Sequence, residues 1–170
     1  MKKQAHRLLL LLLLPLLTSC PDNVDPLPDS AYTPVLMSRQ QLEASIAQKE
    51  PRAIVKPGKL YRYRHYILIN ELYKGVHIID NQNPKSPVNV AFIQVPGCVD
   101  MAVKENVLYV DNAVDLVAIS LDDVNNLQVT SRVRNALPEL PAPDNMEVWY
   151  GKGGAPEDAV VVGWELRKSE

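Results

Sequence analysis

The chain has 170 residues, of which 46% are hydrophobic and 22% are charged, and its formal net charge at pH 7 is −2. This length suffices for one domain with a buried core. A weakly negative balance argues against nucleic acid as a partner, because nucleic-acid binding requires clustered positive charge. With only two cysteines, the chain offers neither a disulfide framework nor a cysteine-based zinc site.

The N-terminus combines a basic start with a short apolar run. Lys2, Lys3 and Arg7 precede this run, which covers the ten residues 8–17. A run of this length fits a signal peptide, whereas a membrane-spanning helix needs about 20 apolar residues. Residues 1–19 are therefore predicted to be a signal peptide.

The end of the run, Leu17-Thr18-Ser19-Cys20, resembles the lipobox of bacterial lipoproteins. The resemblance implies a diacylglyceryl group on the Cys20 sulfur and cleavage before that residue. It also implies a lipid anchor in the cell envelope, expected at the periplasmic or surface face of the outer membrane. An ordinary secretory signal is the alternative. Cleavage leaves 15 basic and 20 acidic side chains, a formal charge of −5.

Two segments separate the anchor from the main domain. Residues 20–37 hold the lipidated cysteine and four prolines, which predicts an extended tether. Residues 38–51 predict one short helix, because Ser38 and Gln41 form a capping box and Pro51 ends the helical pattern.

Residues 52–170 alternate with the period of two that is typical of β-strands. The apolar runs recur after a shift of 41 residues, so that Tyr66–Asn70 falls on Val107–Asp111. A four-strand unit that repeats about every 40–45 residues is typical of a β-propeller blade. The sequence therefore predicts an all-β fold of antiparallel, four-stranded, blade-like repeats with one short N-terminal helix.

These repeats make up a partial propeller with two clear units and a remnant. The units are expected over residues 59–97 and 98–133, and the remnant over 144–166 as a strand pair at 146–150 and 159–164. A plain β-sandwich whose hairpins are alike by chance is the alternative.

The stretch from Gly75 to Asn81, followed by Asn83-Pro84, resembles the LVIVD repeat, and Val99–Val103 is similar to it. LVIVD repeats occur in propellers of bacterial and archaeal surface proteins. The whole chain, with its entry segment Tyr32–Ser38, is similar to lipoproteins of the Bacteroidota. The resemblance implies a β-propeller with several blades, whereas this chain carries two clear repeats. It therefore indicates a short or truncated member, an open sheet assembly, or a protein completed by association.

Three aspartates around the second repeat are candidate calcium ligands: Asp100, Asp111 and Asp115. The run from Asp111 to Asp115 lacks the ligand spacing and the glycine of an EF-hand loop, so turn chemistry is the favoured interpretation. His77 lies in the middle of a predicted strand and is expected to be exposed or paired across the sheet rather than catalytic. Cys98 is expected to be a small buried apolar residue.

The sequence carries no recognisable catalytic constellation. The expected function is a non-enzymatic binding or scaffolding module for a protein or glycan, without metal or cofactor and held in the membrane through Cys20. Exposed strand edges predict self-association. The alternative is a fragment of a larger propeller protein or enzyme whose active residues lie in further blades.

Overall fold

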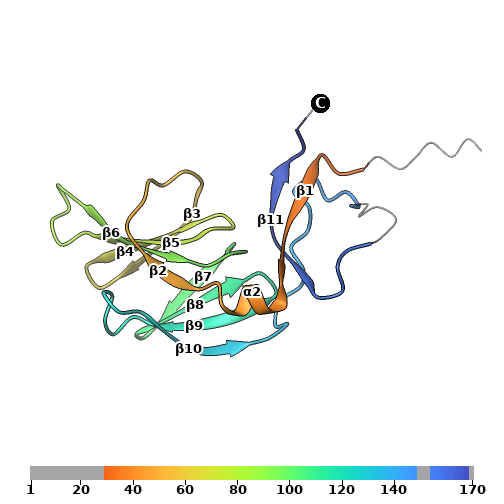
Figure 1. Ribbon diagram of the computed structural model, residues 1–170. Coiled ribbons are helices and arrows are strands. Elements are labelled where there is room, and N and C mark those ends of the chain that lie inside the picture. The colour runs from red at the N-terminus through yellow and green to blue at the C-terminus, as the bar shows by residue number, and fades with distance from the viewer. Residues whose placement is uncertain (1–28, 149–153, 169–170) are drawn as a thin grey trace, which may run out of the picture.

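The computed structural model describes residues 29–148 and 154–168, which form three antiparallel sheets and one short helix (Figure 1). The prediction of a mainly β, antiparallel protein is confirmed. The signal peptide and Cys20 lie outside the described residues. The elements are β1 (Tyr32–Ser38), α2 (Arg39–Glu43), β2 (Ala47–Lys49), β3 (Pro57–Tyr63), β4 (Tyr66–Glu71), β5 (Gly75–Asp80), β6 (Val88–Gln94), β7 (Met101–Lys104), β8 (Val107–Asn112), β9 (Asp115–Ser120), β10 (Gln128–Val133) and β11 (Ala159–Leu166).

The first two sheets share one strand pattern. The first sheet has the order β2-β6-β5-β4-β3 and the second has the order β10-β9-β8-β7. β4 and β8 begin 41 residues apart, as the sequence predicts. Each sheet also carries a register shift in its last hairpin, which leaves Val90 and Thr130 as the extra residues. Strand order and irregularities therefore recur together.

The main core lies between these two sheets. Successive residues of a strand point to opposite faces, so each sheet contributes alternate residues to the core. We call the face of the first sheet that packs against the second sheet a front face, and the face of the second sheet that packs against the first a back face; the opposite face of each sheet takes the other name. The front face of the first sheet consists of Leu68, Val76, Ile78, Ala91 and Ile93, and the back face of the second sheet consists of Met101, Leu108, Val110, Val117 and Ile119. All ten side chains are at most 6% exposed. Full burial of one such Leu, Ile or Val contributes roughly 1.5–3 kcal/mol.

The back face of the first sheet is partly covered by the chain itself. β2 and β3 occupy opposite edges of this sheet, and residues 50–56 connect them. Arg52 lies over this face, with its guanidinium carbon 4.4 Å from the centre of the Phe92 ring. His77, which points to the same face, is fully buried. Of the two expected alternatives, exposure of His77 is wrong, because the crossover covers this face. Pairing across the sheet is right, since His77 on β5 contacts Glu71 on the neighbouring strand β4.

The helix is shorter than the expected segment of residues 38–51. Its start agrees with the prediction, since Ser38 and Gln41 form the capping box. It ends at Glu43, and the Ser45 hydroxyl donates to the Leu42 carbonyl oxygen at 2.7 Å. Ala47–Lys49 then pairs with β6. Pairing with an existing sheet edge satisfies the backbone better than a further exposed helical turn.

The third sheet pairs the two ends of the described chain (Figure 1). β1 runs antiparallel to β11, with Ser38 opposite Ala159. The expected tether over residues 20–37 is therefore wrong for Tyr32 onward. The expected strand partner for β11 is also wrong, because residues 146–148 are not in a strand. Val35 and Met37 pack with Val160 and other apolar side chains, and this burial explains why β1 belongs to the fold.

Candidate functional site

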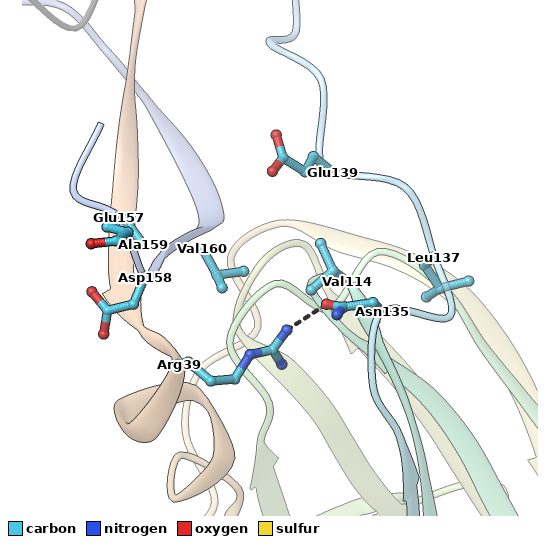
Figure 2. Close-up of a pocket in the computed structure, with 9 residues that line it drawn as sticks. All are labelled: Arg39, Val114, Asn135, Leu137, Glu139, Glu157, Asp158, Ala159 and Val160. Carbon is cyan, nitrogen blue, oxygen red and sulfur yellow. Dashed lines mark hydrogen bonds between the residues drawn. The ribbon is translucent and has the colours of Figure 1, made fainter. Parts of the chain in front are cut away.

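A pocket of about 400 Å³ opens between the β1–β11 sheet and the second sheet. Apolar side chains form part of its wall, among them Val114 in the β8–β9 turn and Val160 on β11. Figure 2 shows Arg39 and Asn135 at one end of the pocket and Glu139 at the other, with Val114 and Val160 between them. The complete lining is Arg39, Val114, Asn135, Leu137, Glu139, Glu157, Asp158, Ala159 and Val160.

Arg39 is held at the pocket by a buried carboxylate. Its Nη1 donates to both Asp115 carboxylate oxygens at 2.8 Å, and Nη2 donates to the Asn135 side-chain oxygen at 2.5 Å. Asp115 is fully buried and also accepts from Arg132 Nη1 at 2.7 Å and from the Asn135 N–H at 3.0 Å. The guanidinium groups of Arg39 and Arg132 and the Asn135 N–H thus supply hydrogen bonds to both oxygens of Asp115. These bonds hold Arg39 in place at the wall of the pocket.

Opposing effects set the pKa of Asp115. Burial raises the pKa of this carboxyl, because it disfavours the charged form. Hydrogen bonds from Arg39, the Asn135 N–H and Arg132 outweigh burial and hold the pKa below its ordinary value. Asp115 is therefore an ionised anchor at neutral pH.

The three candidate calcium ligands do not converge. Asp115 is committed to arginines, whereas Asp100 forms an ion pair with Lys59 at 2.6 Å. Asp111 accepts from the backbone N–H groups of Val99 and Asp100 at 3.1 and 2.7 Å, so it ties β8 to the segment before β7 instead of bonding the backbone of its own turn. No group of three or more His, Cys, Asp or Glu side chains within the described residues could hold a metal ion.

A second buried polar cluster lies under the crossover of the first sheet. His77 Nε2 is 2.7 Å from Glu71 Oε2, which also pairs with Arg52 Nη2 at 2.9 Å. Burial raises the pKa of Glu71, but the hydrogen bonds from His77 and Arg52 bring it below its ordinary value. Asn89 Nδ2 donates to the Arg52 carbonyl oxygen at 2.7 Å. The cluster joins the crossover to β4, β5 and β6, and both His77 and Glu71 within it are buried.

Cys98 behaves as the sequence predicts. It is a free, fully buried cysteine in the main core, and burial raises the pKa of its thiol. The thiolate, which is the reactive form, is therefore strongly disfavoured. Cys98 therefore serves to pack the main core.

Sequence reasoning missed the pocket. Arg39 lies in the predicted helix, while Glu139 and Asp158 lie in segments without a periodic pattern, so nothing local joins them. Comparison with protein-family models, with curated proteins and with solved structures found no match to this chain. Among the described residues, no helix has the length and apolar character that crossing a membrane requires.

Proposed function

We propose that this protein is a lipid-anchored envelope protein that binds another protein without catalysis. In this proposal the pocket beside Arg39 receives a basic side chain of the partner. The single observation that supports it most directly is the pocket itself, which combines apolar walls with carboxylates. A binding role also suits the two ion clusters, in both of which the charged side chains are paired with one another.

The lining of the pocket favours a cationic group. Glu139, Glu157 and Asp158 contribute three negative charges against one positive charge from Arg39, and that positive charge is already paired with Asp115. A lysine or arginine side chain has an apolar stem and a charged head. Its stem matches Val114 and Val160, and its head matches the carboxylates.

The pocket can be tested with a labelled lysine decapeptide and the full chain in nonionic detergent, by fluorescence anisotropy. Replacing Glu139 and Glu157 together by Gln should weaken binding about fivefold, since each exposed ion pair contributes roughly 0.2–1 kcal/mol. The matched control replaces Glu50 and Glu105 by Gln, which removes the same net charge elsewhere on the surface. An equal loss in both double variants would show that only net charge matters and would contradict the proposal.

The proposed anchor is the lipid on Cys20. Several acyl chains together hold a protein stably in a bilayer, at roughly 0.8 kcal/mol per buried methylene. Cys20→Ala should therefore move the protein out of the lipid-anchored fraction, which detergent phase partitioning with Triton X-114 measures. In the wild type, mild protease treatment that removes the N-terminus together with Cys20 should likewise release the protein from the detergent phase. If the treated protein still partitioned into that phase, lipidation at this cysteine would be contradicted.

A second candidate function is a unit of a larger propeller, as the resemblance to the LVIVD repeat implies. The recurring meander at a 41-residue offset supports the proposal that the two sheets are blade-like repeats. On this proposal further blades would carry the activity. A native envelope protein heavier than the 19.0 kDa chain, detected by an antibody against this chain, would favour it.

A further inference from the structure

The two sheets are equivalent residue by residue, which defines two further faces. Leu68 lies opposite Ile78 in the first sheet, and Tyr109 lies opposite Ala118 at the same place in the second. The register continues into the last hairpins, where Ile93 and Val133 correspond. The front face of the second sheet, equivalent to the buried front face of the first, consists of Tyr109, Leu116, Ala118, Ser131 and Val133.

The registers of the two sheets also show which residues of the first sheet are equivalent to the buried back face of the second sheet. Met101 opposes Val110 in the second sheet, and Leu60 opposes Ile69 in the first. The open back face of the first sheet consists of Leu60, Ile67 and Ile69, on the half that residues 50–56 leave uncovered. It is equivalent to the back-face residues of the second sheet that are buried against the first.

Burial differs sharply between the equivalent positions. Ile93 is 1% exposed, whereas Val133 is 54% exposed; Met101 is 6% exposed, whereas Leu60 is 64% exposed. The internal interface therefore joins a front face to a back face and leaves one face of each kind open.

We infer that the front face of the second sheet binds the open back face of the first sheet in a second copy of this chain. The occupant is a second copy because the contact continues an interface that the chain already forms between its own two sheets, and because each copy carries both halves. The inference is independent of the pocket and of the proposed basic partner.

Such a contact joins different surfaces of the two copies. A contact of this kind builds closed rings or open filaments, whereas a contact between identical surfaces stops at a dimer. The full chain should therefore form assemblies larger than dimers as its concentration rises.

The test is sedimentation equilibrium of the full chain in a density-matched nonionic detergent. Val133→Asp alters the front face and Leu60→Asp alters the back face; each should weaken assembly at least about tenfold, because the contact would bury an unpaired carboxylate against apolar side chains. Both side chains are more than half exposed, so the far-UV circular dichroism spectrum should stay unchanged. Leu166→Asp is the matched control, since Leu166 is 68% exposed and lies on β11 outside both faces.

Mixing the two variants gives the decisive result. The intact front face of Leu60→Asp can bind the intact back face of Val133→Asp, so the mixture should form a dimer and nothing larger. A monomeric wild type would overturn the inference. It would also be overturned if Val133→Asp alone abolished assembly while Leu60→Asp had no effect, which indicates front-to-front contact. Assembly that neither variant changes would point to strand edges instead and would overturn it as well.

Discussion

At the residue scale, Asp115 links segments that lie far apart in the chain. Arg39 precedes both large sheets, Arg132 lies on the last strand of the second sheet, and both donate to this one carboxylate. A buried carboxylate is costly unless its charge is paired and its oxygens accept hydrogen bonds. Here both oxygens have partners, so the ion cluster ties α2 to the second sheet and shapes the pocket.

Asp115→Asn should lower the free energy of unfolding at pH 7 by about 3 kcal/mol, because removal of one buried partner leaves unpaired guanidinium groups. The folded pKa of Asp115 lies below its ordinary value. Its contribution is therefore present above about pH 4 and is lost as the pH falls through the folded pKa. Urea unfolding at pH 7 and in acid should show the gap between wild type and variant closing in acid.

Asp100→Asn is the control for this measurement. Asp100 pairs with Lys59 at the surface, where the side chain is 55% exposed. Exposed pairs contribute about 0–1 kcal/mol. A loss at pH 7 as large as that of Asp115→Asn would contradict the special role of the buried carboxylate.

Gly75 is a second residue with a demanding position. Its φ is +143°, and an added Cβ would overlap the carbonyl oxygen of Ile93 in the neighbouring strand. Gly75→Ala should therefore destabilise the protein by at least about 2 kcal/mol more than Gly154→Ala, through strain and overpacking. Gly154 also has positive φ, at +65°, but a Cβ there would meet nothing within 4 Å. Equal melting temperatures for the two variants would contradict this reading.

At the scale of elements, α2 depends on its contacts. A helix of five residues is unstable alone, since nucleation is unfavourable. The capping box at Ser38 sets its start, and fully buried Leu42 packs it against Val114 and Val160. The helix in turn places Arg39 at the pocket, so burial of one leucine supports the geometry of the site.

Leu42→Ala should lower the free energy of unfolding by about 2–5 kcal/mol through lost burial and the cavity it leaves. Gln40→Ala, at an exposed position of the same helix, should change it by less than about 0.5 kcal/mol. Guanidinium denaturation of both variants checks the difference. Similar midpoints would mean that the helix is not anchored through its apolar side.

At the scale of the whole molecule, the three sheets share their packing. The main core joins the first and second sheets, and the β8–β9 turn packs against the β1–β11 sheet. Tyr73, in the turn between β4 and β5, lies against Gly163 and packs with Trp164 on β11. Each sheet therefore contributes to the burial of another.

This sharing predicts one cooperative thermal transition. In a Trp149→Phe background, Trp164 is the only tryptophan and its fluorescence reports on the β1–β11 sheet. Its midpoint should coincide with that of far-UV circular dichroism, which reports on all strands. An earlier fluorescence transition would show that the β1–β11 sheet unfolds separately.

Features that depend on neighbouring residues could be predicted from the sequence. The period of two identified the strands from β3 to β10, the 41-residue offset matched β4 with β8, and Ser38 with Gln41 marked the start of the helix. Burial of Cys98 also followed from residue type. These features were predictable because side-chain alternation and capping are local.

The partners of segments that lie far apart in the chain could not be predicted in this way. Ala47–Lys49 joined a sheet edge instead of extending the helix, β1 paired with β11, and the crossover buried His77. The pocket likewise gathered Arg39, Val114 and Asp158 from three separate segments. The physical reason is that an apolar face or an unpaired strand edge specifies only that it must be covered. Which distant segment covers it depends on how the complete set of faces packs.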